Sequence, residues 1–510
     1  MKSIIVDGKN LSISDIERVA RGNARISLGK DVKGKIAAAQ KIVKRAINDK
    51  EIVYGATTGF GALSSVFISE KKRKQLQKNI ILSHSAGVGD AFKEEVVRAI
   101  MLLRINGLAQ GHTGIQFRTL KNLTEMLNKG VHPVIPEKGS VGASGDLAPL
   151  AHMALVLIGE GKAFYKDRVL SGKQAMRAAD IAISKLDAGE GLSLVNGTQV
   201  MTGIGALAVH DSMRLLKTAD IAAGMSLEVL LGSNIELNEK IHEVRPHNGQ
   251  ITSAENLRRI TRDSEIISSH YDCSRVQDAY SIRCCPQVHG ASKDALDFVK
   301  KIVDTEINSA TGNPLIFPDT GEIFNNGGNF HGQPIALAMD FLAIALSEIA
   351  NISERRIERL VNPLLSGLPA FLVKDPGLNS GFMIAQYTAA ALVSENKTLS
   401  HPASVDSIPT SANKEDHVSM GCISARKCKQ ILFNAENVIA IELLCATQAL
   451  DLLTNRKAGA GTKEAYTVIR KYIPYLDADR ILSEDIEKMC RLVRDGTILS
   501  SVEKRIGVLK

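Results

Sequence analysis

A short run of small residues near position 144 has a composition that could support unusual backbone chemistry. The segment GSVGASGDLAPLAHM covers residues 139–153, and its glycines recur at intervals of three: Gly139, Gly142 and Gly145. Glycines in such a pattern are typical of a tight turn. The least specific interpretation is a turn before a helix, with Asp146 as the N-cap of that helix.

A tight bend would also bring the Gly145 nitrogen within reach of the Ala143 carbonyl carbon. Small residues are needed on both sides of Ser144, because a larger side chain would obstruct ring closure. Attack of the nitrogen on this carbon, followed by loss of two waters of which one comes from Ser144, yields a methylidene-imidazolone. The sequence therefore allows an electrophile built from its own backbone, with no external cofactor.

Other motifs with catalytic associations lack the context that they require. GIGALA at residues 203–208 matches a dinucleotide-binding pattern, but no convincing strand precedes it, which favours close helix packing. Ser144 is disfavoured as a hydrolase nucleophile, because Asp146 stands where a nucleophile elbow needs glycine. The sequence contains no P-loop, no HExxH motif and no zinc-type Cys/His spacing, so no metal site is expected.

The composition excludes several classes of protein. The 510 residues include 63 basic and 55 acidic side chains, 4% aromatic residues and no Trp, which does not indicate nucleic-acid binding. The seven Cys all lie in the second half and form no CxxC pair, which favours a reducing cytosol over a disulfide scaffold. No uninterrupted apolar run approaches the length of a membrane span. We therefore expect a cytoplasmic protein without nucleic-acid or membrane partners.

Hydrophobic periodicity predicts that mostly helices position these motifs. Apolar residues recur on one face in residues 94–108 and 342–360, and residues 431–453 are apolar nearly all round, as in a buried helix. Short strands are expected at residues 2–5 and 51–54, and the segment 315–324 suggests a hairpin. The expected fold is mainly α, a long helical bundle with a loop-rich N-terminal region.

Proline placement suggests how the chain is organised. None of the 14 prolines precedes Pro133 and none lies between Pro149 and Pro246, which leaves room for long helices. We expect residues 1–200 to form a loop-rich region that carries the cofactor turn, and residues 201–510 to form the long-helix bundle. No clear linker marks this boundary, so its position near residue 200 is approximate.

Six further blocks occur in the chain in the order known from one enzyme family. They are YGATTGFG at 54–61, SHSAGVG at 83–89, LVNGTQV at 194–200, VQDAYSIRCCPQVHGA at 276–291, GGNFHGQP at 327–334 and SENKTLSHPASVDSIPTSANKEDHVSMG at 394–421. With the turn around Ser144 they resemble the aromatic amino acid ammonia-lyases over about residues 50 to 450. The resemblance implies a 4-methylidene-imidazole-5-one cofactor formed autocatalytically from Ala143, Ser144 and Gly145. It also implies elimination of ammonia from an α-amino acid to give a trans-α,β-unsaturated acid.

The resemblance implies catalytic roles for four residues: Tyr54, Ser144, Tyr280 and Glu415. Ser144 supplies the methylene that bonds covalently to the substrate, either at its amine or at its ring. Tyr54 matches the base that removes the β-proton, and its glycine-rich loop suits a mobile lid. Tyr280 is the competing base, or a hydrogen-bond partner of the cofactor. A tyrosine base needs a lowered pKa to act near pH 7–9, which a nearby electrophile and cation could supply.

The resemblance also implies substrate-binding roles for five residues: His84, Asn196, Gln277, Arg283 and Phe330. Arg283 matches the residue that binds the substrate carboxylate through two parallel hydrogen bonds. Gln277, Tyr280 and Arg283 are three residues apart, which on a helix would place them on roughly one face. Asn196 and Gln277 match donors to the cofactor carbonyl or the carboxylate, and Phe330 matches a ring-packing position.

Two family-matched residues favour histidine as the substrate. His84 occupies the position that faces the substrate ring in this family, and Glu415 is the matched acid in the SANKEDHVSM block. An imidazole has two nitrogens, so both side chains can hydrogen-bond to it, whereas a carboxylate is less useful beside a phenol or phenyl ring. The expected reaction converts L-histidine to trans-urocanate, the first step of histidine degradation. A tyrosine ammonia-lyase or an aminomutase on the same cofactor is the alternative.

Three positions depart from the family pattern: Thr57, Gly312 and Lys414. Lys414 stands where Gln is more usual, and a close approach to Glu415 would lower the pKa of that carboxyl and weaken it as a proton acceptor. The resemblance further implies a homotetramer in which several subunits build each site. A catalytically silent helical assembly protein, with an uncyclised turn, is the alternative from another functional class.

Overall fold

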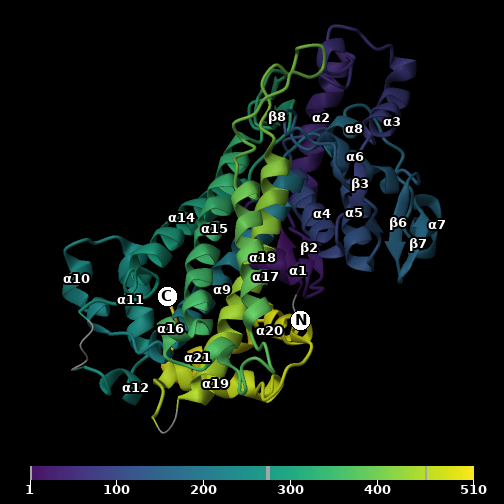
Figure 1. Cartoon of the computed structure of the whole chain (residues 1–510). Coiled ribbons are helices and arrows are strands. Elements are labelled where there is room, and N and C mark those ends of the chain that lie inside the picture. Colours follow the sequence, from purple (N-terminus) through teal and green to yellow (C-terminus); the bar gives the residue numbers. More distant parts are fainter. Residues whose placement is uncertain (1–2, 272–275, 454–455) are drawn as a thin grey trace. The chain divides into compact units, whose positions relative to one another are not determined.

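The computed structural model describes residues 3–271, 276–453 and 456–510, and these are mainly helical, as predicted. Contacts divide the chain into two compact units that interleave along the sequence. Unit 1 contains residues 1–210, 300–340 and 402–426, and unit 2 contains residues 211–299, 341–401 and 427–510. Four long helices have residues in both units: α9 (Gln199–Val229), α14 (Cys285–Glu306), α15 (Gln333–Val361) and α18 (Gly421–Leu452) (Figure 1). The predicted domains 1–200 and 201–510 stay a prediction, since each of these helices crosses from one unit to the other.

Unit 1 combines helices with short strands. Its shorter helices are α1 (Ile13–Ala20), α2 (Val32–Asn48), α3 (Arg73–His84), α4 (Glu94–Ala109), α5 (Phe117–Lys129), α6 (Leu147–Leu157), α7 (Gly172–Ala178) and α8 (Glu190–Val195). Its strands are β1 (Ile4–Val6), β2 (Ile26–Leu28), β3 (Val88–Ala91), β4 (His132–Pro133), β5 (Pro136–Lys138), β6 (Lys162–Tyr165), β7 (Arg168–Ser171), β8 (Leu315–Phe317) and β9 (Glu322–Phe324). The pairing is β1 with β2 in parallel, and β3–β5, β4–β6–β7 and β8–β9 antiparallel.

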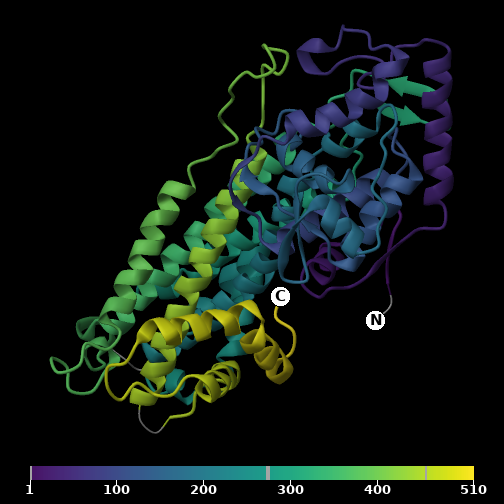
Figure 2. The same cartoon turned by 90° about the vertical axis from the view of Figure 1, so that its right-hand side faces the viewer.

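The predicted hairpin is confirmed as β8 and β9, with Leu315 opposite Phe324. It lies against α2 (Figure 2), where Ala39, Ile42, Val43 and Ile316 form a buried apolar cluster. The strand predicted at residues 51–54 is wrong. This segment enters a turn instead, because the Thr57 side chain and main chain bond back to Val53. The strand predicted at 2–5 overlaps β1, and Lys2 lies outside the described residues.

The core of unit 1 lies around α4 and the first turns of α9. The predicted helix over residues 94–108 is confirmed as α4, nearly all of which is buried. GIGALA lies within α9, as its helical interpretation predicts. A Cβ on Gly203 would lie 3.3 Å from the Ile100 nitrogen, and one on Gly205 would lie 3.0 Å from the Met339 sulfur. The glycines therefore allow close helix packing, not nucleotide binding.

Unit 2 is helical, and its helices carry a buried polar network. Besides its parts of the long helices, it contains α10 (Glu239–Glu243), α11 (Asn248–Ile260), α12 (Glu265–Ser268), α13 (Tyr280–Arg283), α16 (Pro363–Ser366), α17 (Met383–Leu399), α19 (Ala460–Tyr472), α20 (Leu482–Arg494) and α21 (Thr497–Ile506). Helices α17 and α18 run side by side (Figure 1), joined by the hydrogen bond from Asn434 to Glu395. Arg356 forms two hydrogen bonds, of 2.5 and 2.8 Å, with Glu442, and both side chains are fully buried.

The predicted helix over 342–360 falls within α15, and that over 431–453 falls within α18 except for its last residue, Leu453. By length and composition alone, both helices could cross a membrane. However, 67% of the most apolar window of α15 and 83% of that of α18 are buried inside the protein. Such burial is what core helices of soluble proteins show, so their apolar sequences are explained by packing.

Candidate active site

A cavity of about 870 Å³ in unit 1 gathers most of the predicted site residues. Its wall is built from the glycine-rich loop at residues 54–61, the end of α3, the turn before α6, and the segments 325–331 and 411–417. The predicted residues that line it are Tyr54, His84, Ala143, Ser144, Asn196, Phe330 and Glu415. Side chains from distant parts of the sequence therefore meet at one place.

The turn that carries Ser144 has left-handed glycines and no room for larger residues at their positions. Gly142 and Gly145 have φ values of +68° and +67°, a region that other residues rarely adopt. A Cβ on Gly142 would lie 2.2 Å from Ser419 Oγ, and one on Gly145 would lie 2.1 Å from the Gly197 carbonyl oxygen. Neither position can carry a side chain without displacing its neighbours. The residues present therefore fit a cofactor formed from this turn.

Asp146 occupies the N-cap position of α6, as predicted, but its side chain does not cap that helix. The buried carboxylate instead accepts hydrogen bonds from the Val200 and Met201 main-chain nitrogens, at 3.0 and 2.9 Å. It also accepts one from Ser140 Oγ at 2.7 Å. Burial raises the pKa of Asp146 to about 6, and the hydrogen bonds that it accepts oppose this rise. The expected capping role is therefore corrected: Asp146 fastens the turn to the first turn of α9.

Glu415 lies directly beside Ser144. Its Oε1 atom accepts a hydrogen bond from Ser144 Oγ at 2.9 Å, and its Oε2 atom accepts one from Thr410 Oγ1 at 2.8 Å. Two main-chain hydrogen bonds between Thr410 and Glu415, of 2.9 and 3.3 Å, close the turn that carries the carboxylate. The acid predicted to contact the substrate ring is thus held next to the residue predicted to form the electrophile.

Tyr54 projects into the same cavity. Its hydroxyl oxygen accepts a hydrogen bond from the Gly61 main-chain nitrogen at 2.9 Å. Burial raises the pKa of Tyr54; the Gly61 N–H opposes this rise and the negative charge of Glu415 adds to it. The lowered pKa expected from the sequence is therefore not found within the single chain. The physical reason is that burial and a nearby carboxylate both disfavour the phenolate.

His84 is the last residue of α3, and it lines the cavity. The ring makes an edge-to-face contact with Phe60 at 6.5 Å between centroids, and its Nδ1 atom lies 3.1 Å from Ser83 Oγ. Burial lowers the pKa of His84, against the effect of the Glu415 charge. A neutral imidazole is therefore favoured, and it can both donate and accept a hydrogen bond.

Asn196 connects the Ser144 turn to two asparagines that sequence reasoning missed. Its Nδ2 atom donates to the Ser144 carbonyl oxygen at 3.0 Å, and its Oδ1 atom accepts from the Asn313 nitrogen at 2.7 Å. Asn313 Nδ2 donates to the Asn325 carbonyl oxygen at 3.0 Å, and Asn325 Oδ1 accepts from the Tyr54 nitrogen at 2.9 Å. The only signal in the sequence was position, because Asn313 and Asn325 flank the predicted hairpin.

Comparison with known proteins agrees with this arrangement. Residues 11–471 match the family model for aromatic amino acid lyases. A histidine ammonia-lyase from Alkaliphilus oremlandii is 55% identical over 506 residues, which cover 99% of this chain and 99% of that protein. The chain belongs to the aromatic amino acid lyase family.

Solved structures of other aromatic amino acid lyases have the same fold. The histidine ammonia-lyase from Trypanosoma cruzi matches with a TM-score of 0.92 and 43% identity, covering 99% of this chain and 96% of that one. A tyrosine aminomutase from Streptomyces globisporus matches with a TM-score of 0.94 and 38% identity over the whole of both chains. The helical architecture is therefore shared by enzymes with different products.

Three predicted site residues of this aromatic amino acid lyase lie in unit 2 and are not among the described residues that line the cavity: Gln277, Tyr280 and Arg283. Tyr280 is 71% exposed, and the Arg283 guanidinium carbon lies 5.1 Å from the centre of its ring. The predicted common helix face is wrong for Gln277. Helix α13 begins only at Tyr280, because the preceding Ala279 has extended backbone angles.

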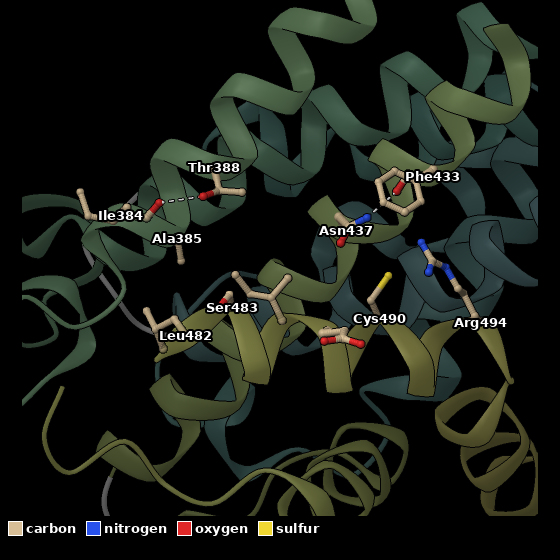
Figure 3. A pocket seen from close by; sticks show the side chains of 11 residues that line it. Ile384, Ala385, Thr388, Phe433, Asn437, Leu482, Ser483, Cys490 and Arg494 are labelled. Carbon is tan, nitrogen blue, oxygen red and sulfur yellow. Dashed lines mark hydrogen bonds between the residues drawn. The ribbon is translucent and has the colours of Figure 1, made fainter. Parts of the chain in front are cut away.

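Unit 2 of the lyase holds a smaller cavity, of about 640 Å³, between α17, α18 and α20 (Figure 3). Its lining is mostly apolar and includes Ile384, Phe433, Leu482 and Cys490, with Arg494 at one end. None of the predicted catalytic residues lines it. The described residues also contain no group of three or more His, Cys, Asp or Glu side chains that could hold a metal ion. Most of the predicted site residues line the cavity of unit 1 instead.

Proposed function

We propose that this aromatic amino acid lyase is a histidine ammonia-lyase, which eliminates ammonia from L-histidine to give trans-urocanate. The observation that carries the proposal is the position of the Glu415 carboxylate, 2.9 Å from the Ser144 hydroxyl that cyclisation would remove, in a cavity that also holds the His84 imidazole. The carboxylate and the neutral imidazole offer the acceptor and donor that an imidazole substrate needs. The similarity to histidine ammonia-lyases over the whole chain also supports it.

We infer that the turn cyclises by itself to 4-methylidene-imidazole-5-one, with Ala143, Ser144 and Gly145 as its source. The positive φ of Gly145 and the close approach of Gly197 support this step. The group supplies an electrophilic methylene that activates the substrate for loss of ammonia. Asn196 donates a hydrogen bond to the Ser144 carbonyl oxygen, which stabilises negative charge that develops on that side of the ring.

The other residues orient the substrate and move its proton. Glu415 and His84 hold the substrate ring, and Phe330 packs against it. Tyr54 removes the β-proton, and the Gly61 N–H on its oxygen stabilises the phenolate that this role requires. These four side chains are half-buried within the single chain, so they shield the reacting carbon from water only in part.

We propose that each site is completed by another copy of the chain in a homotetramer. Gln277, Tyr280 and Arg283 of the partner subunit would bind the substrate carboxylate and the cofactor. Two observations support this. Tyr280 is largely exposed within its own chain, and α15 carries an exposed apolar stripe of Leu337, Phe341 and Ile344 at helical spacing. Such a stripe is typical of a surface that another copy covers.

We place the enzyme in the cytoplasm, without nucleic-acid or membrane partners. The six cysteines in the described part of the chain have free thiols, which fits a reducing compartment. The burial of α15 and α18 accounts for their apolar character without a bilayer.

One assay separates the proposed function from the alternative on the same cofactor. L-histidine and L-tyrosine are supplied separately, and the conjugated product is followed by ultraviolet absorbance and by mass spectrometry. We expect urocanate from L-histidine at a kcat/KM far above that for tyrosine. The likeness to a tyrosine aminomutase makes tyrosine the relevant competitor. Equal or better turnover of tyrosine, or a β-amino acid product, would refute the assignment.

A further inference from the structure

Two segments far apart in the sequence are fastened together at the rim of the unit 1 cavity. The first is the loop that carries Tyr54 and ends in a short 3-10 turn at Gly61–Leu63. The second is the turn from Thr410 to Glu415. Ser411 Oγ of the second accepts a hydrogen bond from the Ala62 main-chain nitrogen of the first, at 3.2 Å. A Cβ on Gly61 would lie only 2.4 Å from the same oxygen atom, so the segments are in close contact.

The turn that presents this hydroxyl has an unusual backbone. Ser411, Ala412 and Asn413 have φ values of +52°, +51° and +63°, so three consecutive residues with side chains are left-handed. Each such residue costs roughly 1 kcal/mol or more. The bonds that hold the turn are those between Thr410 and Glu415 and the one from the Lys414 nitrogen to the Ser411 carbonyl oxygen at 3.0 Å. Strain of this kind persists where the surroundings require one particular geometry.

The contact links two side chains with proposed roles in catalysis. The Gly61 nitrogen donates to the Tyr54 hydroxyl, and the next nitrogen along, that of Ala62, donates to Ser411. In the second segment, the Thr410 hydroxyl donates a hydrogen bond to the Glu415 carboxylate, and the same carboxylate accepts one from Ser144 Oγ. Hydrogen bonds and the peptide bonds between neighbouring residues therefore connect the proposed base to the proposed ring-binding acid by way of one exposed serine.

We propose that Ser411 is a positioning residue that fastens the Tyr54 loop to the Glu415 turn, so that base and acid are set together around the substrate. The proposal rests on the proposed ammonia-lyase function and extends it to a residue outside the substrate contacts. Without the Ser411 hydroxyl, the Ala62 N–H loses its acceptor, and the neighbouring Gly61 N–H is less firmly held on the Tyr54 oxygen.

The main test compares Ser411→Ala with the matched control Ala412→Gly. Both positions are exposed and left-handed, but the control keeps the Ser411 hydroxyl. We expect Ser411→Ala to lower kcat for L-histidine about three- to tenfold, the effect of one hydrogen bond, and Ala412→Gly to stay within about twofold. The rising limb of the kcat–pH profile reports deprotonation of Tyr54. We expect this limb to move to higher pH only in Ser411→Ala, because a weaker Gly61 hydrogen bond stabilises the phenolate less. The cavity's other titratable groups, His84, His331, Lys414, Glu415, Asp416 and His417, are the same in both variants.

A double-mutant cycle with Gly61→Ala tests whether the contact itself is responsible. The new methyl group meets Ser411 Oγ in the wild type but not in Ser411→Ala, whereas the cost of a left-handed alanine is the same in both. We expect Gly61→Ala to reduce kcat more in the wild type than in the Ser411→Ala background. Additive effects, or identical kcat and pH profiles for Ser411→Ala and Ala412→Gly, would overturn the proposal.

Hydrogen exchange separates failure of this proposal from failure of the proposed function. We expect faster amide exchange at Gly61 and Ala62 in Ser411→Ala than in Ala412→Gly, whatever the substrate. Unchanged exchange rules out the fastening role even in an active enzyme. A wild-type chain that forms no urocanate contradicts the proposed function, and the exchange result then decides the role of Ser411 independently.

Discussion

The residue that organises the cavity is Ser144, whose hydroxyl donates to Glu415 while its carbonyl oxygen accepts from Asn196. A carboxylate so close to the reacting group has two effects. It offers a hydrogen-bond acceptor to an imidazole substrate, and its negative charge contributes to the raised pKa of Tyr54. Because burial and this charge both disfavour the phenolate, the proposed base depends on a neighbouring cation or on the substrate to ionise at moderate pH.

Ser144→Ala removes the hydroxyl whose loss as water creates the methylene. We expect ammonia-lyase activity to be abolished while the helical circular dichroism spectrum is unchanged, because alanine fits this small-residue turn. Intact-mass measurement of the wild type should show a chain that lacks the mass of two waters, with the loss at the Ser144 peptide. Retained activity in the variant, or a wild-type peptide of full mass, would exclude the proposed cofactor.

Glu415→Gln removes the negative charge near Tyr54 but keeps the size of the side chain. The phenolate then becomes easier to form, so the Tyr54 pKa falls. Since the base acts when deprotonated, activity rises with pH through this pKa, and the rising limb should move to lower pH in the variant. We also expect kcat/KM for L-histidine to fall about ten- to a hundredfold, because a charged hydrogen bond to the ring is lost. A limb that stays in place or moves to higher pH contradicts the electrostatic link.

At the scale of elements, the turn before α6 is held by the start of another helix. The Asp146 carboxylate satisfies two main-chain nitrogens in the first turn of α9, where a helix has N–H groups without partners of its own. Its negative charge also suits the positive end of the helix dipole. The tight turn is therefore positioned by a long helix that extends into unit 2, and not only by its own glycines.

Asp146→Ala should lower the free energy of unfolding by about 1–3 kcal/mol, since it leaves two buried N–H groups without an acceptor. Urea denaturation followed by circular dichroism measures this difference. Asp31→Ala is the matched control, because Asp31 also occupies an N-cap position, that of α2, but makes no capping hydrogen bond there. The control should unfold nearly as the wild type does. Equal effects of the two substitutions would contradict the fastening role of Asp146.

The sequence predicted the features that depend on local pattern. The turn at Ser144, the hairpin over residues 315–324 and the long apolar helices were all expected, because glycine spacing and periodicity act over a few residues. Two errors concern long-range contacts: Asp146 bonds to α9, and the Tyr54 pKa depends on burial and on Glu415. The other two have local causes: Thr57 bonds back to Val53 where a strand was predicted, and Ala279 is extended just before α13. The sequence did not indicate roles for Asn313, Asn325 and Ser411, because their hydrogen-bond partners Asn196, Tyr54 and Ala62 are distant in the sequence.

At the scale of the whole molecule, the described lining of the unit 1 cavity lacks a predicted partner for the substrate carboxylate. The described lining of the unit 1 cavity contains the proposed electrophile, acid and base, but not Arg283, the predicted partner of the substrate carboxylate. Within its own chain, the Arg283 guanidinium lies over the exposed ring of Tyr280. This half-buried guanidinium is the group that we propose to reach the site of another copy of the chain.

Complementation between two inactive variants tests the shared site directly. Ser144→Ala lacks the electrophile and Arg283→Ala lacks the carboxylate partner, so each alone should be inactive or nearly so. If a site takes Ser144 from one subunit and Arg283 from another, random co-assembly of equal amounts gives intact sites in about a quarter of positions. We therefore expect co-expressed variants, differently tagged and purified through both tags, to recover a comparable share of wild-type activity. A mixture of separately folded variants that do not exchange subunits should stay inactive. Co-assembled oligomers without activity would show that both residues must come from the same chain.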